Sequence, residues 1–213
     1  MEIREYFEAP ELELNKWLEL KRGKFSASLI HKIMKGFNNE TSQTYIDTLA
    51  GESIGVYDDD PFQSQAMING SVQELTAMQV YIANHAKGEV LYGSKIFIPL
   101  GENAGVSPDG IEYLENESIY LEVKCPSAPN KYVGLLKCKD TETLKKKRPD
   151  VYWQCVMNML VLGCQSAKVL LYHHNRGLNV LNVERIEADI NELQTALTKA
   201  IVLKLELTQS LLA

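Results

Sequence analysis

The spacing of apolar residues changes twice along the chain, and this change restricts the fold more than any other feature of the sequence. Before residue 88 they recur every three or four positions, as in amphipathic helices, whereas between residues 90 and 124 they alternate, as in strands. Helical spacing returns over residues 151–162, followed by two alternating stretches and a final amphipathic helix from near Asp189. This order predicts a mixed α/β fold around one sheet.

Cap and turn residues place the individual elements. We expect helices over residues 15–20, 26–36, 44–54, 67–86, 151–162 and 189–213. We expect strands over residues 90–92, 95–99, 104–106, 110–113, 118–124, 167–172 and 178–186. The acidic stretch at 58–61 predicts a loop, because adjacent like charges and a proline oppose a helix. The final helix is expected to pack on the sheet and leaves room for a subunit interface.

Composition indicates a single globular domain. Of 213 residues, 45% are apolar and 23% are charged, close to the average of globular proteins. We expect one domain over residues 1–213, with a helical part at 1–87, a sheet at 88–126 and a helix–strand–helix remainder at 127–213. The net charge of −6 argues against a uniformly basic nucleic-acid surface, although it permits a local basic groove.

Neither a membrane segment nor a disulfide framework is expected. The chain has no run of about 18 apolar residues, and its acidic N-terminus does not resemble a signal peptide, which predicts a cytoplasmic protein. The spacing of the four cysteines, at 125, 138, 155 and 164, matches no zinc or redox pair, so we expect reduced, buried thiols. The four histidines, at 31, 85, 173 and 174, also lack zinc-like spacing and are expected to be structural or at the surface.

Two segments carry the residues best suited to chemistry, Ser107-Pro108-Asp109-Gly110 and Leu121-Glu122-Val123-Lys124. Strand alternation places Glu122 and Lys124 on one face, and Asp109 precedes a neighbouring strand that would pass beside Glu122. Two adjacent carboxylates repel each other unless a cation lies between them, and such an oxygen-rich pair suits Mg²⁺. Lys124 would then orient or help to deprotonate a water. Spacing alone also permits a plainer interpretation, a solvated strand face and an ordinary turn.

The same segments, extended to Cys125-Pro126, resemble the core motif of the lambda exonuclease and YqaJ-type viral recombinase family of PD-(D/E)XK nucleases. Four further segments agree with this family in order: 17–28, 45–55, the Gly70, Glu74 and Ala77 helix, and Tyr152-Trp153-Gln154 with Met159. The resemblance spans residues 17 to about 172. It implies an α/β, restriction-endonuclease-like core, in which a central mixed β-sheet is flanked by helices, and makes residues 88–126 the catalytic sheet.

The resemblance also implies roles for individual residues. Asp109 and Glu122 would bind catalytic Mg²⁺, or Mn²⁺, with the backbone carbonyl of Val123. Lys124 would position the attacking water, and Glu74 would reach the site from the preceding helix. From the residues alone, Glu74 is also compatible with a solvent-facing helix carboxylate.

A second group of residues is implied to bind substrate. Ser26 and Ser28 lie at a predicted helix start, where backbone N–H groups favour anions, and Lys21 and Arg22 add positive charge. In the family such a cluster binds a 5′-terminal phosphate. Lys21 stands where the family usually has Arg, so either cation is a candidate, and an ordinary helix cap is the plainer alternative. Gln154 is a further candidate, on the helix that follows the basic run 145–148. We expect that run to be a solvated loop, which could also meet a DNA backbone.

Together these features imply a Mg²⁺-dependent exodeoxyribonuclease that degrades one strand of linear double-stranded DNA from a 5′ end. The remaining 3′ single-stranded tail would serve recombination, and the family implies a homotrimer and a single-strand annealing partner. Two alternatives stay open: an endonuclease or repair nuclease of the same superfamily, and a catalytically silent DNA-binding module. The silent module is disfavoured because Asp109, Glu122 and Lys124 are all present. Relatives with an iron–sulfur cluster are disfavoured because no cysteine precedes residue 125.

Overall fold

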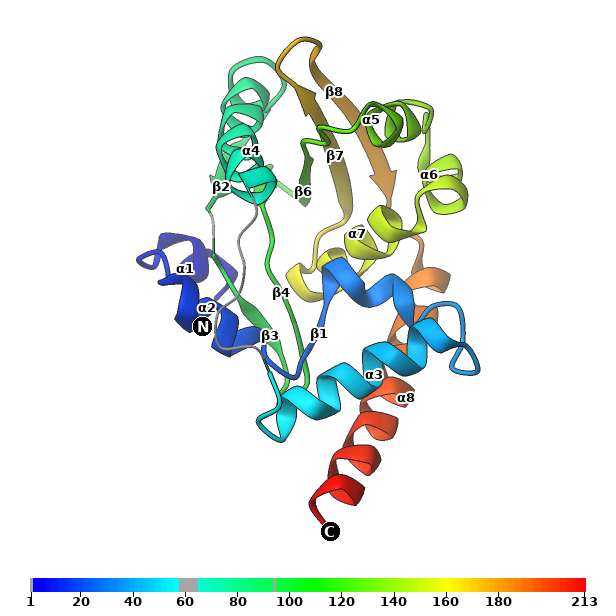
Figure 1. The fold of residues 1–213 in the computed structure, drawn as a ribbon. Coiled ribbons are helices and arrows are strands. Elements are labelled where there is room, and N and C mark those ends of the chain that lie inside the picture. The colour runs from blue at the N-terminus through cyan, green and yellow to red at the C-terminus, as the bar shows by residue number, and fades with distance from the viewer. Residues whose placement is uncertain (1, 58–64, 94) are drawn as a thin grey trace.

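Two β-sheets organise residues 2–57, 65–93 and 95–213, which a computed structural model describes (Figure 1). The larger sheet has the order β2-β5-β6-β7-β8, with β2 (Glu89–Tyr92), β5 (Gly110–Tyr113), β6 (Ser118–Lys124), β7 (Ser166–His173) and β8 (Gly177–Glu184). Only β6 and β7 within it run parallel; the other neighbours are antiparallel. The sheet is therefore mixed, as expected.

The smaller sheet was not predicted. It has the order β1-β4-β3 and consists of β1 (Phe25–Ser26), β4 (Ala104–Val106) and β3 (Ile98–Leu100). The expectation of one sheet is wrong because β1 has only two residues, too few to show an alternating pattern, and it pairs with a strand almost 80 positions later. The predicted acidic loop at 58–61 lies outside the described residues.

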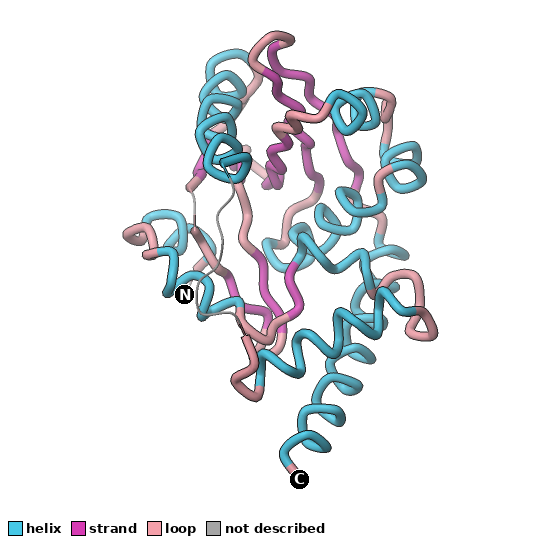
Figure 2. The backbone as a smooth tube through the Cα atoms, in the orientation of Figure 1, coloured by secondary structure: helices cyan, strands magenta, loops and turns pink. Residues whose placement is uncertain are grey.

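Helices pack around both sheets (Figure 2). They are α1 (Ile3–Glu8), α2 (Leu14–Lys21), the 3₁₀-helix η1 (Ala27–Lys32), α3 (Glu40–Ser53), α4 (Gln65–Asn84), α5 (Pro129–Leu136), α6 (Thr141–Lys147), α7 (Pro149–Leu162) and α8 (Glu187–Leu212). None of the described helices is long and apolar enough to cross a membrane. The sequence pattern missed α1, α5 and α6, which are all short.

The basic run at 145–148 is not the loop that we expected. Its three lysines form the last turn of α6, where cations interact favourably with the carbonyl end of a helix. The helix starts at Asp140, whose carboxylate accepts a hydrogen bond from the N–H of Thr143 at 2.8 Å. A cap residue at one end and cations at the other therefore stabilise a helix of only seven residues.

The two faces of the larger sheet are covered by different helices. One face packs on α4 through a cluster that includes Met78, Tyr81, Leu121 and Val123. The opposite face packs on α7, with Tyr120 among its fully buried side chains. Alternation along β6 thus sends odd-numbered residues toward α4 and even-numbered residues toward α7. The final helix, α8, packs mainly on α3 and α7 rather than on the sheet, contrary to expectation.

Candidate active site

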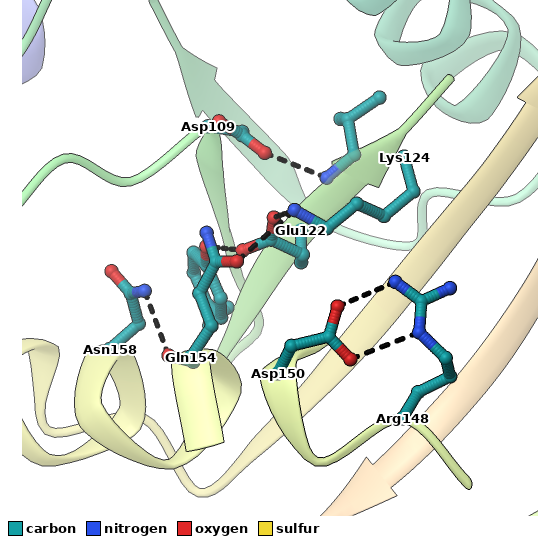
Figure 3. A network of polar contacts seen from close by, with 9 residues as sticks. Asp109, Glu122, Lys124, Arg148, Asp150, Gln154 and Asn158 are labelled. Carbon is teal, nitrogen blue, oxygen red and sulfur yellow. Dashed lines mark hydrogen bonds and ion pairs between the residues drawn. The ribbon is translucent and has the colours of Figure 1, made fainter. Parts of the chain in front are cut away.

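Asp109 and Glu122 come together where β5 begins and β6 ends (Figure 3). Gly110 of β5 is paired with Leu121 of β6, so the residue before Gly110 meets the residue after Leu121. Asp109 Oδ2 accepts a hydrogen bond from the backbone N–H of Val123 at 2.7 Å. The predicted juxtaposition of the two carboxylates therefore follows from the strand register.

Glu122 lies on the α7 side of the sheet and is only 1% exposed. Its Oε1 pairs with the Lys124 Nζ at 2.6 Å, and its Oε2 accepts a hydrogen bond from the Tyr120 hydroxyl. All three side chains point to the same face because they occupy alternate positions of one strand. Glu122 and Lys124 are thus not the solvated strand face that spacing alone permitted.

Burial makes the charges of this cluster interact strongly. Loss of solvation raises the pKa of Asp109 well above its ordinary value, and the Glu122 charge adds to the rise, against the opposing effect of Lys124. Burial lowers the pKa of Lys124, but the combined attraction of Glu122 and Asp109 outweighs it and raises that pKa. The Lys124 ammonium is therefore stabilised by two carboxylates that it only partly neutralises.

Glu74, on α4, is exposed to solvent, and it lies near enough to the cluster for its charge to interact with those of Lys124 and Glu122. Its pKa is raised mainly by loss of solvation and also by the charge of Glu122, while Lys124 opposes the rise. Gly110 explains why α4 can come so near, because a Cβ atom at this position would lie 2.8 Å from Cε of Met78, one helical turn beyond Glu74. Whether Glu74 takes part in metal binding stays a prediction.

Gln154 reaches the cluster from α7. Its Oε1 accepts a hydrogen bond from Lys124 Nζ at 3.1 Å, and its backbone carbonyl accepts another from the Asn158 amide at 3.0 Å. Nearby on the same helix, Asp150 forms a bidentate ion pair with Arg148 at 2.6 and 2.9 Å (Figure 3). The structure thus places Gln154 beside the catalytic candidates and not among the serines.

The donor set fits a hard divalent cation. Three carboxylates, those of Asp109, Glu122 and Glu74, interact electrostatically with the single ammonium of Lys124. The acidic groups therefore outnumber the cation, and a bound metal ion would offset this excess of negative charge. In the described part of the chain, no three acidic, imidazole or thiol side chains are close enough to form a complete cage. Mg²⁺ suits such an incomplete set, because it keeps several waters and often completes its shell with substrate phosphate.

The other predicted residues line a separate cavity of about 570 Å³. Lys21, Arg22, Ser26 and Ser28 all contribute to its wall. Further lining residues come from α3 and from the segment after it: Tyr45, Thr48, Leu49, Glu52 and Tyr57. The structure therefore brings four of the five predicted substrate-binding residues together, and the fifth, Gln154, lies in the carboxylate cluster.

The two candidate cations of this cavity differ in their surroundings. Lys21 Nζ lies 3.7 Å from the ring centre of Trp17, and burial lowers the pKa of this lysine to about 8. The Arg22 guanidinium carbon lies 3.3 Å from the ring centre of Tyr57. Both cations therefore lie over aromatic rings. The cation–π attraction helps to hold the two charged groups at the wall of the cavity.

Ser26 occupies the cap position of a helix, as predicted, but without a side-chain cap bond. Ser26 and Ser28 lie at the start of a six-residue 3₁₀-helix, and the Ser26 N–H donates to the Tyr45 hydroxyl at 3.1 Å. The Ser26 and Ser28 hydroxyl oxygens are 3.4 Å apart. The two hydroxyl groups and the two cations are thus polar groups available at the cavity wall.

Strand pairing connects the cavity to the carboxylate cluster. Ser26 is paired with Gly105 on β4, and the chain runs from β4 directly through Ser107 and Pro108 to Asp109. The 3₁₀-helix η1 also packs on α7, which carries Gln154. The spacing between the two sites is therefore fixed by packed secondary structure on both sides.

Several residues of these sites were missed by the sequence analysis. Tyr120 could have been found, because it precedes Glu122 by two positions on the same strand face. Glu52 and Tyr57 could not, because their roles depend on packing: Glu52 accepts a hydrogen bond from the N–H of Gly23 at 2.7 Å. Gly23 itself is required there, since its φ of +66° is unfavourable for other residues.

Comparison with known proteins gives one matching family model and several solved structures of similar fold. The family model described as the YqaJ-like viral recombinase domain matches residues 16–165. The structure is similar to that of an alkaline exonuclease, LHK-Exo, from Laribacter hongkongensis, with a TM-score of 0.75 and 21% identity over 92% of this chain and 95% of that chain. A structure of LHK-Exo in complex with dAMP is also similar, with a TM-score of 0.73 and 22% sequence identity. This similarity again covers 92% of this chain and 95% of that chain.

A third similar structure is a phage related exonuclease from Haemophilus somnus 129PT. Its TM-score is 0.62 at 13% identity, over 88% of this chain and 95% of that chain. No curated protein matches the sequence. At these identities the similar structures establish the fold, and they agree with the expected restriction-endonuclease-like core with its mixed sheet.

Proposed function

Because this chain belongs to the YqaJ-like viral recombinase domain family, we propose that it is a metal-dependent deoxyribonuclease acting on the ends of linear duplex DNA. The observation that carries this proposal is the buried cluster of Asp109, Glu122 and Lys124 at the end of β6. The similar exonuclease structures support it, and one of them binds dAMP, a deoxynucleoside monophosphate such as hydrolysis from a DNA end would release.

Asp109 and Glu122 would hold the divalent cation, which we propose to be Mg²⁺, with Mn²⁺ as a possible substitute. The carbonyl of Val123 and the Glu74 carboxylate are the additional candidate ligands. Bound there, the cation supplies a water of lowered pKa and offsets the charge that develops on the phosphoryl oxygens.

Lys124 would position the attacking water and hold it against the scissile phosphodiester. Its Nζ has three hydrogens, and Glu122 and Gln154 accept two of the hydrogen bonds that they can form. The remaining hydrogen is available to water or to a phosphoryl oxygen. Because the neighbouring carboxylates favour the charged form of Lys124, positioning and charge stabilisation suit this residue better than proton removal.

The cavity lined by Lys21, Arg22, Ser26 and Ser28 would hold a 5′-terminal phosphate. Two cations and two hydroxyls match the charge and the acceptor oxygens of a phosphate monoester. Since β1 and β4 fix the spacing to Asp109, an anchored end would determine which phosphodiester reaches the metal. Repeated cycles from the 5′ end would leave a 3′ single-stranded tail for recombination.

Family membership also supports a homo-oligomer, specifically a trimer, and an annealing protein that would take up the exposed single strand. Sedimentation of the purified protein tests the first of these directly. A trimer mass across a tenfold range of concentration supports the assembly, and a monomer mass contradicts it.

Digestion of DNA with defined ends tests the proposed activity. Linear duplex with a labelled 3′ end should shorten from the 5′ side in Mg²⁺ and not in EDTA, and covalently closed circles should resist. Glu122→Gln should be inactive, whereas Glu115→Gln, at an exposed turn, should behave like the wild type. Circles cut as fast as linear DNA would instead support the endonuclease alternative, and duplex binding without any cleavage would support the silent module.

A further inference from the structure

Three aromatic rings are in contact at the turn between β7 and β8: the His173 and His174 rings are stacked, and the Tyr132 ring meets the His173 ring edge to face, at an interplanar angle of 65°. The ring centre of Tyr132, on α5, lies 5.5 Å from that of His173, and the His173 ring lies 4.4 Å from the His174 ring at an interplanar angle of 23°. Tyr132 is buried, His173 is half-buried and His174 is exposed. A buried tyrosine therefore supports the stacked histidine pair from the core side, and His174 is the exposed member of the pair.

This stack lies on the catalytic side of the sheet. Leu171 is paired with Lys124, and alternation places His173 on the same face as Leu171. His173 lies two residues beyond Leu171, which along a strand is roughly 7 Å, or about two nucleotides of a B-form strand, and the His174 ring lies a further 4.4 Å from the His173 ring. The turn that carries the histidines passes between α4 and α5, beyond the end of β6 (Figure 1).

The charge of this region suits a nucleic-acid strand. None of the residues from 151 to 183 is acidic, in a chain that has 28 acidic residues among 213. The turn itself contains one cation, Arg176, whose N–H donates to the carbonyl of His173 at 2.8 Å and so closes the turn. A DNA strand leaving the carboxylate cluster along this face would thus meet no repelling carboxylate from these residues.

His174 contributes little that the fold requires. Within the described residues its side chain makes no hydrogen bond to another group, and its recorded ring contact is with His173. His173, in contrast, packs on Tyr132 and accepts a hydrogen bond from the N–H of Asn175 at 3.3 Å. The inner histidine closes the turn, whereas the outer one is free to contact a ligand.

We infer that the outer face of His174 is a stacking platform for a nucleobase of the strand being cleaved, two or three nucleotides from the scissile phosphodiester. Bases of every sequence have a π-face, so such a platform would be blind to sequence, as an exonuclease requires. It would bind a base only after that base has left its pair, and it would therefore favour an opened duplex end. This inference rests on the proposed nuclease function and adds a binding site to it.

The platform is tested by measuring how His174→Ala and the removal of one base from the DNA, singly and together, change the affinity. Duplexes carry one abasic site, in turn at each of the first three nucleotides from the 5′ end, and dissociation constants are measured by fluorescence anisotropy in Ca²⁺. At one position the abasic site should weaken wild-type binding at least about fivefold, the lower end of the usual effect of one stacked base. His174→Ala should weaken binding of intact DNA by a similar factor and should lose nothing more on that abasic DNA.

Two further variants complete the test. His174→Trp should restore affinity for intact DNA, because indole stacks as well as imidazole, and His85→Ala should change nothing, although it removes another exposed, ring-stacked histidine. Two results would overturn the platform. In one, His174→Ala and the abasic site weaken DNA binding independently, so that their effects on the dissociation constant multiply; in the other, His174→Ala binds intact DNA as tightly as the wild type does. Failure of the proposed function is a separate result, since it appears as absence of cleavage by the wild-type protein in Mg²⁺.

Discussion

Lys124 Nζ lies 3.1 Å from Gln154 Oε1, so a residue of α7 holds the lysine that pairs with Glu122 on β6. This contact joins two elements that the sequence separates by 30 positions. It also assigns Gln154 a place beside the reacting groups, whereas family resemblance alone suggested a role in substrate binding. The two roles make different kinetic predictions.

Gln154→Ala should lower kcat by about tenfold or more and change KM by much less. The substitution removes one hydrogen bond to a charged group, which is worth about 1.5–3 kcal/mol. Steady-state cleavage of a 5′-phosphorylated duplex measures both constants. Gln194→Ala, on the exposed side of α8, is the matched control. If KM rises while kcat is unchanged, Gln154 binds substrate and does not position Lys124.

Asp109→Asn should abolish cleavage and, without metal, make the fold more stable at neutral pH. The pKa of Asp109 is raised in the folded protein, so the folded state binds its proton more tightly than the unfolded chain does. Stability from this group is therefore complete below about pH 4 and falls as the pH rises through the folded pKa. Urea unfolding in EDTA between pH 4.5 and 8 should show this decline in the wild type and a weaker one in Asp109→Asn.

Metal binding gives a second readout of the same variant, independent of activity. Mg²⁺ should raise the Tm of the wild type, because binding to the folded state alone stabilises it, and should not raise the Tm of Asp109→Asn. Asp47→Asn, on the exposed side of α3, should respond to Mg²⁺ like the wild type. An equal Tm shift in all three proteins would remove Asp109 from the metal site.

Lys124→Ala should reduce the single-turnover rate by about 10²- to 10⁴-fold, the usual scale for a lost acid–base or positioning group. DNA affinity in Ca²⁺ should change far less, because one of many cations near the phosphates is lost. Lys16→Ala, at the surface of α2, controls for a general loss of positive charge. A collapse of affinity with a preserved rate would make Lys124 a binding residue.

Strand β6, which carries the proposed catalytic residues, could be predicted in detail from the sequence, because alternation is a local property. Residues 118–124 were expected as a strand and form β6, and Glu122 and Lys124 share a face as expected. The helical spacing of α4 was a weaker guide: Leu75 and Ile82 are 49% and 39% exposed, while Ala77 and Tyr81 are fully buried. The spacing of apolar residues identifies a helix, but the shape of the sheet on which the helix packs decides which of its side chains are buried.

The terminal-phosphate cavity could be predicted only in part. Its cations and serines are close in sequence and match a family segment, so they could be named in advance. Glu52 lies in the last turn of α3 and Tyr57 in the segment after it, and only the tertiary fold brings them to Gly23 and Arg22. The cap-like spacing of Ser26 and Ser28 did identify a helix start at Ser26, but that helix is a six-residue 3₁₀-helix and the Ser26 side chain makes no cap bond.

A buried network on the α4 side of the sheet makes a separate prediction about stability. Glu112 is fully buried and accepts hydrogen bonds from the Tyr81 hydroxyl at 2.5 Å and from Lys168 Nζ at 2.9 Å. Lys168→Met would leave this carboxylate without its cation and should lower the free energy of unfolding by about 3–5 kcal/mol. Lys16→Met, at an exposed pair, should change it by less than about 1 kcal/mol.

The same carboxylate should make the protein sensitive to acid. Burial alone would raise the pKa of Glu112, but hydrogen bonds from Tyr81, the Lys87 N–H and Lys168 outweigh it and hold the pKa at about 2. Since the folded pKa is below the unfolded one, the stability it provides is present above about pH 4.5 and is lost as the pH falls toward 2. Glu112→Gln should show a shallower loss in urea unfolding over that range, and an unchanged slope would contradict the assignment.

The preference for a 5′-phosphate should depend on pH through Lys21. Burial lowers the pKa of Lys21 to about 8, so its ammonium is mostly present at pH 7 and mostly absent at pH 9.5 in the free protein. A phosphate monoester is a dianion across this range, and it would raise the lysine pKa somewhat on binding. We therefore expect kcat/KM for 5′-phosphate ends to exceed that for 5′-hydroxyl ends at least about tenfold at pH 7, because one hydrogen bond to a charged group is gained. This ratio should fall toward 1 as the pH rises to 9.5.

Both substrates are cleaved by the same carboxylates, so titration of the metal site changes kcat/KM for both by the same factor. That factor cancels in the ratio of the two kcat/KM values. Lys21→Arg should keep the ratio high at both pH values, since a guanidinium does not titrate there, and Lys21→Met should keep it low at both. Ser28→Ala should lower the ratio without changing its pH dependence. If the ratio is flat in the wild type and is lost only in Arg22→Met, then Arg22, held over Tyr57, is the cation that meets the phosphate.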